Sequence, residues 1–342
     1  MTKNNNFDFL RFLFAIFVVI SHAYPLSGDH ESSQWIYKIT DGQIVLARFG
    51  LDGFFIISGF FIFQSLQRSN TLLSYYKKRF LRLFPALFIV LVISTLLLPA
   101  VYRGVTPILE NPQVYSYLPN NLSLYNFQAV IKGVFDDNPY HSINGSLWTI
   151  RYEFSLYIAL SLLYFFKENE IVKKALILMC FICFIVLYDF FLSRFAGSSV
   201  FGMIGYEILD LGTFFVCGSL LAAFKFEKHI QKWMLPLAIL LVIISIKYDF
   251  YSVSKHFLLP IIILIIGFTQ LPFFSTFGKI GDMSYGIYIY SFPIQQALVY
   301  FYKLNVYELM FWSLIISIAF GYLSWHLVEK RALKYKNISI FK

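Results

Sequence analysis

Apolar runs of membrane-spanning length recur from one end of the chain to the other, separated by short polar or Pro- and Gly-containing breaks. A helix that crosses a bilayer needs about 20 mostly apolar residues. The pattern therefore predicts an all-α membrane protein with about ten transmembrane helices in a single domain, residues 1–342. The predicted spans are about 7–26, 44–66, 82–101, 147–166, 173–192, 206–226, 232–248, 256–271, 283–302 and 308–328.

The composition supports this interpretation and excludes an ordinary soluble domain. Apolar residues make up 58% of the 342 residues, charged residues only 14%, and aromatic residues reach 20%. Soluble domains are typically about 45–50% apolar and about 25% charged. No removable leader is expected, because the first apolar run lacks a small-residue cleavage site and contains Arg11 and His22.

The net charge of +9 indicates membrane topology rather than binding to nucleic acid. Lys and Arg gather in short clusters between apolar runs, as the positive-inside rule describes. With a cytoplasmic N-terminus, most of the 28 basic residues fall in cytoplasmic segments, so both ends are predicted to be cytoplasmic. The long connection at about 102–146 then lies outside, as a candidate cover for an outer site. The predicted location is the bacterial cytoplasmic (inner) membrane.

Neither the cysteines nor the histidines indicate a metal site. Cys180, Cys183 and Cys217 all lie within apolar runs, so we expect small core thiols instead of a disulfide or a zinc site. His326 precedes Glu329 by three residues, but the sequence offers no third ligand. We therefore expect no metal cofactor.

Three polar groups interrupt the first apolar run, FDFLRFLFAIFVVISHAYP at residues 7–25. A helix turns 100° per residue, so Arg11 and His22 differ by only about 20° around the axis, and Asp8 lies within about 60° of both. Along the axis, Arg11 and His22 are about 16 Å apart. Each residue alone is compatible with a snorkelling arginine or a hydrogen-bonded core histidine. The aligned pair favours function, because charged groups inside a membrane usually face a cavity or one another.

A second basic group is KKRFLRLFPA, residues 77–86. Arg79 and Arg82 are three residues apart, so both point to one side of a helix. Two guanidiniums on one face suit bidentate recognition of phosphate. The alternative is positive-inside anchoring, which explains Lys77 and Lys78 well and the paired arginines less well.

These residues resemble the acyltransferase 3 family of integral membrane proteins. Arg11 and His22 match the family's pattern of arginine, ten residues and histidine, and RFLR (79–82) matches its RxxR motif. GLDGFFIISGFFI (50–62) is similar to the family's GVDxFFxxSGF segment and aligns Asp52 with its acidic residue.

Later segments continue the resemblance in the order of the family. SLWTIRYEFSLY (146–157) resembles the W-T/S-L-x-x-E-x-x-x-Y element and aligns Glu153. GDMSYGIYIYSFPIQ (281–295) is similar to the S-Y-x-x-Y-x-x-H/S-x-P element. The tail SWHLVEKRALK resembles the family's helix end, although Arg331 stands where proline is common. The resemblance covers nearly the whole chain.

The resemblance implies acyl transfer across a membrane. Members of the family take acetyl, or sometimes another short acyl group, from cytoplasmic acyl-coenzyme A and transfer it to a hydroxyl of an extracytoplasmic or lipid-linked glycan. Some members carry a fused SGNH hydrolase domain. This chain ends soon after its tenth predicted span, so we expect a stand-alone member. The expected partners are acetyl-CoA, a cell-surface polysaccharide or its lipid-linked precursor, and membrane lipids.

The chemistry of this transfer assigns roles to the candidate catalytic residues. A hydroxyl that attacks a thioester needs a general base, and histidine suits this task near neutral pH. His22 is therefore the predicted base, with Asp52 and Glu153 as candidates to orient the imidazole or the acceptor. The alternatives are that Asp52 begins a helix and that Glu153 pairs with Arg151 or another buried charge.

The donor is predicted to bind with its phosphates at the cytoplasmic mouth, where Arg11, Arg79 and Arg82 hold them. The slender pantetheine arm then reaches inward and presents the thioester near His22. An uncharged hydroxyl is expected to stabilise the oxyanion of the thioester. The candidates for this role are Ser284, Tyr285 and Tyr288.

The alternative function is a transporter or flippase for a lipid-linked sugar or an anion, with the same polar stripe as its path. The chain shows no strong internal repeat and no second pair of Gly- or Pro-broken helices, which argues against a transporter. The sequence leaves open the acceptor hydroxyl, the choice between O- and N-acylation, the length of the acyl group and the oligomeric state.

Overall fold

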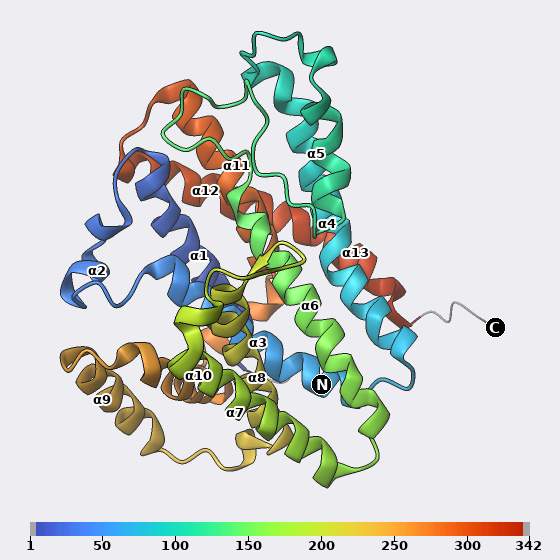
Figure 1. Ribbon diagram of the computed structural model, residues 1–342, viewed down its shortest axis with the longest axis vertical. Helices are drawn as coiled ribbons and strands as arrows, with labels where there is room; N and C mark the ends of the chain where they lie inside the picture. The colour runs from blue at the N-terminus through green and yellow to red at the C-terminus, as the bar shows by residue number, and fades with distance from the viewer. Residues whose placement is uncertain (1–4, 338–342) are drawn as a thin grey trace.

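The computed structural model describes residues 5–337, which form a bundle of helices with one two-stranded hairpin (Figure 1). The hairpin pairs β1 (Ser199–Val200) with β2 (Met203–Ile204). The helices are α1 (Phe7–Leu26), α2 (Trp35–Ile39), α3 (Leu46–Gln67), α4 (Leu72–Val101), α5 (Pro112–Leu122), α6 (Ile150–Ser161), α7 (Glu170–Phe195), α8 (Gly205–Ala223), α9 (Met234–Lys247), α10 (Tyr251–Phe268), α11 (Ser284–Tyr302), α12 (Val306–Ser324) and α13 (Lys330–Leu333). The predicted all-α class is confirmed.

Seven helical segments of the described chain are long and apolar enough to cross a membrane. They are α1, α3, α4, α7, α8, α10 and the segment Val306–Lys336. Helices also form in the remaining predicted ranges, but α9 has 14 residues and α6 has 12, with 3₁₀ turns on either side of α6. The apolar helices indicate an integral membrane protein, while the count of ten spans and the sides of the two ends stay predictions.

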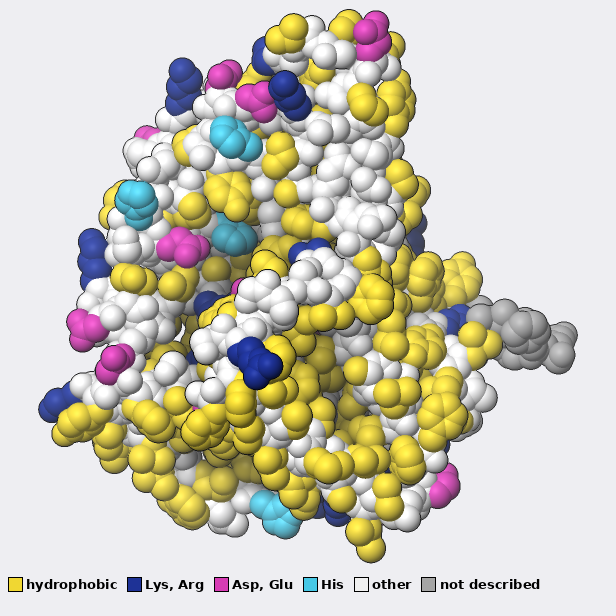
Figure 2. Space-filling view, viewed as in Figure 1, with side chains coloured by type: hydrophobic (Ala, Val, Ile, Leu, Met, Phe, Trp, Pro, Cys, Tyr) yellow, Lys and Arg dark blue, Asp and Glu magenta, His cyan; other side chains and the backbone are white. Residues whose placement is uncertain are grey.

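The surface has the apolar character that contact with lipid requires. Figure 2 shows hydrophobic side chains over most of the lower part of this face, whereas charged and histidine side chains gather toward the upper left. Large apolar side chains are exposed on several helices, among them Leu96 on α4, Phe190 on α7 and Ile243 on α9. Exposed apolar surface on this scale marks an interaction surface, here the hydrocarbon of a bilayer.

Helices α3 and α8 approach each other closely, because glycines let their backbones touch. A Cβ at Gly59 would lie 1.9 Å from the carbonyl oxygen of Phe215, and a Cβ at Gly218 would lie 2.3 Å from that of Ile56. Neither position accepts a larger residue unless the helices separate, as is typical of small residues between membrane helices. This close pair fixes the position of Ser58, which faces the cavity described below.

The connection predicted to lie outside, 102–146, ends in a stretch that returns into the bundle beside α11. The Asn144 side chain is buried and donates a hydrogen bond to the Ile289 carbonyl oxygen (2.8 Å). The Gln296 amide donates to two backbone carbonyls of the same stretch. Irregular backbone is tolerated at membrane depth only where the protein satisfies its polar groups. The connection therefore covers one end of the bundle and also contributes to its interior.

Candidate active site

A cavity of about 460 Å³ lies between α1, α3, α4, α6 and the start of α11, and we call it the arginine cavity. Its volume is that of a small-molecule site. Its basic lining residues are Arg11, Arg68, Lys78, Arg79, Arg82 and Lys336. Its acidic and hydroxyl-bearing lining residues are Ser58, Ser65, Thr149, Glu153, Tyr157, Asp282, Ser284, Tyr285 and Tyr288. The three arginines predicted to hold the donor's phosphates and the three hydroxyl-bearing residues predicted near its thioester therefore all line one cavity, although they come from α1, α4 and α11.

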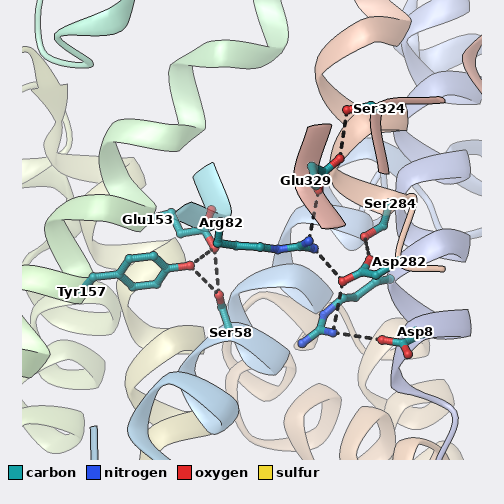
Figure 3. A network of polar contacts seen from close by, with 10 residues as sticks. Asp8, Ser58, Arg82, Glu153, Tyr157, Asp282, Ser284, Ser324 and Glu329 are labelled. Atoms are coloured by element: carbon teal, nitrogen blue, oxygen red, sulfur yellow. Dashed lines mark hydrogen bonds and ion pairs between the residues drawn. The ribbon is translucent and has the colours of Figure 1, made fainter. Parts of the chain in front are cut away.

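Arg82 of α4 is held between two carboxylates at the edge of the arginine cavity (Figure 3). Its Nη2 donates to Asp282 Oδ2 (2.6 Å) and its Nη1 donates to Glu329 Oε2 (3.1 Å). The Ser324 hydroxyl donates to the other oxygen of Glu329 (3.0 Å). Both Nη atoms of Arg82 are thus engaged by protein acceptors, and the guanidinium is fixed in place.

Arg11 of α1 joins the same group of charges. Its Nη1 lies 3.3 Å from Asp8 Oδ1 and 3.7 Å from Asp282 Oδ2. Asp282, which lies just before α11, therefore bridges arginines from two helices. Burial raises the pKa of Asp282, but the positive charges of Arg82 and Arg11 outweigh burial and hold the pKa below its ordinary value.

The sequence analysis assigned no role in this site to Asp282 or Glu329. Glu329 was noted as a possible metal partner of His326 and as part of the tail that resembles the family's helix end, without a role in this site. Both acids could have been identified in the same way as Arg11. Each is a charged side chain within or beside an apolar run, and such a side chain requires a partner of opposite charge or a cavity.

Arg79 of α4 differs from Arg82 because it has no acidic partner. Among residues 5–337 its guanidinium forms no ion pair; its Nη2 makes one long hydrogen bond to Ser65 Oγ (3.4 Å), and its Nε is buried without a partner. Its guanidinium carbon lies 5.8 Å from the centre of the Tyr157 ring. A guanidinium with unused donors beside a cavity is suited to bind a phosphate.

Three further cations line the same cavity as Arg79, and sequence reasoning did not include them in the site. They are Arg68, Lys78 and Lys336. Lys78 was interpreted as a topology anchor, and in the structure its Nζ donates to Ser69 Oγ (3.1 Å). Together these side chains extend the positive charge of the cavity beyond the RxxR motif.

Glu153 of α6 lies on the other side of the arginine cavity. The Ser58 hydroxyl donates to Glu153 Oε1 (2.8 Å), and the Tyr157 hydroxyl donates to the same oxygen (Figure 3). The alternative pairing of Glu153 with Arg151 is wrong. The two positions differ by about 200° around the helix axis, and the Arg151 guanidinium lies over the Tyr152 ring (5.4 Å).

The three residues predicted to stabilise an oxyanion have hydroxyls that are already engaged. Tyr285 donates to a backbone carbonyl of α4 (3.1 Å), and Tyr288 donates to a carbonyl of the 3₁₀ turn η3 (Gly145–Thr149; 2.9 Å). Ser284 donates to Asp282 (2.6 Å). In this conformation each of them holds the walls of the cavity together, and an oxyanion would have to displace one of these bonds.

His22 lies on the same continuous helix as Arg11 but is not among the residues that line the arginine cavity. Its ring centre lies 5.4 Å from that of Phe292, in an edge-to-face arrangement. Its Nδ1 is buried and has no hydrogen-bond partner among the described residues, while the side chain as a whole is only half-buried. The structure thus shows no carboxylate bound to this imidazole, and it does not bring Asp52 or Glu153 to it.

Asp52 belongs to a different group of charges, which joins α3, α8 and α10. We call this group the closed cluster, and it consists of Arg48, Asp52, Glu207, Asp210, Lys255 and His256. Arg48 lies 3.6 Å from Asp52 Oδ1 and contacts Glu207 (2.5 Å) and Asp210. Asp210 also contacts two side chains of α10, each at 2.7 Å. Because α3 begins at Leu46, the alternative that Asp52 begins a helix is wrong.

The structure also places the cysteines and the histidine considered for a metal. No group of three or more His, Cys, Asp or Glu in residues 5–337 is arranged to hold a metal ion. His326 Nε2 lies 3.1 Å from a backbone carbonyl oxygen. Cys217 is buried, Cys180 is half-buried and Cys183 is exposed on α7. The core position expected for all three thiols is therefore found only for Cys217.

Comparisons with known proteins identify the family of the chain. A family model described as "Acyltransferase domain" (Acyl_transf_3) matches residues 4–326. The chain is 27% identical to "O-acetyl transferase" of Shigella phage Sf6 over 340 residues, and this alignment covers 97% of each protein. It is 26% identical over 361 residues to "Nodulation protein 10" of Rhizobium leguminosarum bv. viciae, which covers 97% of this chain and 94% of that protein. No solved structure shows significant similarity. The chain belongs to the acyltransferase 3 family.

Proposed function

We propose that the protein is a membrane O-acetyltransferase that moves an acetyl group from cytoplasmic acetyl-CoA to a hydroxyl of a cell-surface polysaccharide or its lipid-linked precursor. The family and the similarity to a phage O-acetyl transferase support acyl transfer to oxygen. The observation that carries the donor assignment is Arg79, whose guanidinium faces the arginine cavity and has no acidic partner within the described residues 5–337. The proposed location is the bacterial cytoplasmic (inner) membrane.

The basic part of the arginine cavity holds the donor's phosphates in this proposal. Arg79 supplies unused hydrogen-bond donors, and the rim cations add attraction for the anionic nucleotide part. Arg82 is tied to Asp282 and Glu329, so its main task is to keep the cavity in shape. Arg11 is paired at longer distances, 3.3 and 3.7 Å, and is freer to turn toward a phosphate.

The acetyl thioester then lies at the inner part of the arginine cavity, near Tyr288. Phe292 lies one helical turn further along α11, on the same face, and contacts His22. Tyr288 is the last residue of α11 that lines the cavity, and Phe292 is the residue that contacts the imidazole. About 5–6 Å of helix separates the two. We propose that the acetyl group and His22 meet across this turn.

His22 acts as the general base in the transfer. It takes the proton of the acceptor hydroxyl while that oxygen attacks the thioester carbon and forms the new ester bond. The carbonyl oxygen becomes an oxyanion, the carbon–sulfur bond breaks, and the imidazolium returns the proton to the departing thiolate. The imidazole ends neutral, and the products are the acetylated acceptor and free coenzyme A.

The experiment that tests this function compares wild-type protein with His22→Ala in lipid, with acetyl-CoA and candidate glycans. Loss of a general base lowers the rate by about 10²- to 10⁴-fold, and donor affinity is expected to stay unchanged. His229→Ala removes an exposed histidine and is the matched control, with full activity expected. Full acetylation by His22→Ala would contradict the proposed role of His22.

Coenzyme A separates this function from transport of a lipid-linked sugar or an anion. An acetyltransferase binds coenzyme A in its folded state, so saturating coenzyme A stabilises it against thermal unfolding, by about 2.7 kcal/mol at 100 times the Kd. A transporter for a lipid-linked sugar has no site for coenzyme A and would show no shift. Mass spectrometry of surface glycans with and without the protein then identifies the acceptor.

A further inference from the structure

A second cavity, about 730 Å³ in volume, lies against the opposite side of α6 from the arginine cavity. Its walls come from α6, α7, α8 and the β1–β2 hairpin, and its lining is almost wholly apolar. We call it the hairpin groove. Its acidic lining residue, Glu207, is neutralised by Arg48 at 2.5 Å. The groove therefore presents hydrocarbon to an occupant and no free negative charge.

The polar groups around the hairpin groove satisfy one another. The Ile204 backbone N–H donates to Tyr152 Oη (2.7 Å), which fixes the hairpin to α6. The hydroxyls of Tyr125 and Ser155 lie 2.9 Å apart, and Ser155 Oγ contacts Met203 Sδ (3.5 Å). These bonds leave the walls apolar and hold them in place, so the groove is a built feature of the fold.

A cation without a counter-charge in the described part of the chain lies beside the hairpin, next to the groove residue Tyr152 although not itself in the groove's lining. The Arg151 guanidinium lies between two aromatic rings, 5.6 Å from the centre of Phe127 and 5.4 Å from that of Tyr152. A Cβ built on Gly202 of the hairpin would lie 3.2 Å from Arg151 Nη1. Within residues 5–337 Arg151 forms no ion pair, and its Nε is buried without a hydrogen-bond partner.

An apolar groove with a guanidinium beside it that has no ion-pair partner among the described residues is complementary to a hydrocarbon tail that ends in a phosphate. The groove runs along α6 from Tyr152 to Ala159, about 10 Å of helix. We propose that the hairpin groove binds the lipid anchor of the acceptor, with its tail between α6, α7 and α8 and its phosphate on Arg151. This inference rests on the proposed function and assigns the acceptor to the lipid-linked class.

The position of the groove favours the acceptor's own lipid over bulk phospholipid. Helix α6 is a wall of both cavities, because Glu153 and Tyr157 face the arginine cavity while Tyr152 and Ser155 face the groove. Arg151 lies only two residues before Glu153. A sugar attached to a phosphate on Arg151 therefore starts on the opposite face of the helix that forms a wall of the donor site.

Photolabelling tests the binding site without any acetyl transfer. The full-length protein in phosphatidylcholine vesicles is exposed to hexadecyl phosphate that carries a diazirine, or to the matching hexadecanol. We expect the phosphate probe to label α6 and the hairpin, and the alcohol to label them about tenfold less, because a charge-assisted phosphate contact is lost. Equal labelling by the two probes would overturn the assignment, since it indicates general contact with lipid.

Substitutions locate the label and supply a matched control. Arg151→Gln removes the cation, and Ala159→Phe fills the groove from an exposed position; each is expected to lower labelling about tenfold. Arg151→Lys keeps the charge and retains more than half of the label. Ile182→Phe places the same ring on an exposed site of α7 outside the groove and leaves labelling unchanged. Unchanged labelling in both Arg151→Gln and Ala159→Phe would also overturn the assignment.

Acetylation kinetics separate this inference from the proposed function. One oligosaccharide is offered either free or attached to a lipid phosphate, and the wild type is expected to show a KM about tenfold lower for the lipid-linked form. Arg151→Gln and Ala159→Phe are expected to remove this preference. Transfer to both forms with equal KM would overturn the groove assignment while the acetyltransferase function stands. Specific labelling without any acetyl transfer would overturn the function and support the groove.

Discussion

The bundle contains two groups of buried charges, the closed cluster and the arginine cavity, and they differ in whether every cation has a partner. In the closed cluster, Arg48 contacts three carboxylates and Lys255 contacts Asp210. In the arginine cavity, Arg79 has no acidic partner among the residues that the structure describes, and it faces a space of about 460 Å³. A charged residue in an apolar run therefore indicates only that a cluster of polar side chains exists in the fold. A cation without an ion-pair partner beside a cavity indicates a binding site for an anionic ligand.

Arg82 lies between these two cases. It lines the arginine cavity, as Arg79 does, but two carboxylates hold it, as in the closed cluster. Two arginines three residues apart in one motif thus have different surroundings. The comparison predicts that substitutions of paired charges act on stability, while substitution of Arg79 acts on ligand binding.

The largest effect is expected from Asp210→Ala in the closed cluster. The substitution leaves the buried Lys255 and the half-buried Arg48 without their shared partner, which costs about 3–5 kcal/mol of the free energy of unfolding. Thermal unfolding of the purified protein in detergent measures the loss. Glu168→Ala at an exposed site is the control, with a change within about 0.5 kcal/mol. A variant at Asp210 as stable as the wild type would break the comparison.

A smaller loss of stability is expected from Arg82→Ala. The substitution leaves Asp282 and Glu329 without their guanidinium. We expect a loss of about 2–3 kcal/mol, which is less than in the closed cluster because Arg82 has two ion-pair partners whereas the fully buried Asp210 has three. Arg79→Ala is the matched variant in the same helix and should unfold at the wild-type temperature. Equal stability of the two variants would remove the distinction between them.

The smallest effect is expected from the pH dependence of Asp282. Its pKa is lower in the folded protein than its ordinary value, so its contribution to stability is full above the unfolded pKa of about 3.9 and is lost as the pH falls through the folded pKa. The difference in unfolding temperature between wild type and Asp282→Asn should be constant from pH 5 to 8 and should shrink below pH 4. A difference as large at pH 3 as at pH 7 would contradict this linkage.

The sequence predicts the elements of this fold better than it predicts the partners of its charges. Apolar runs locate the long helices, because crossing a bilayer demands their length and composition. The stripe on α1 follows from helical geometry alone. The motifs of the family resemblance select Arg11, Arg79, Glu153, Tyr285 and Tyr288, and the structure places all of them around one cavity.

The partners depend on how helices rotate against one another, which apolar periodicity leaves open. Asp52 is an example: it shares a motif with Ser58, but six residues place the two about 120° apart on α3. Ser58 therefore faces the arginine cavity while Asp52 faces Arg48. Asp282 and Glu329 were missed for the same reason, because their ion pairs with Arg82 join segments about 200 residues or more apart in the chain.

A titration with acetyl-CoA tests the central claim most directly, namely that the arginine cavity binds the donor through Arg79. Wild type, Arg79→Ala and Arg194→Ala are compared in the same detergent, where Arg194→Ala removes an equal charge from an exposed site on α7. We predict wild-type binding of acetyl-CoA, a Kd raised about tenfold or more in Arg79→Ala, and an unchanged Kd in Arg194→Ala. No binding to the wild type, or the same Kd in Arg79→Ala, would contradict the account.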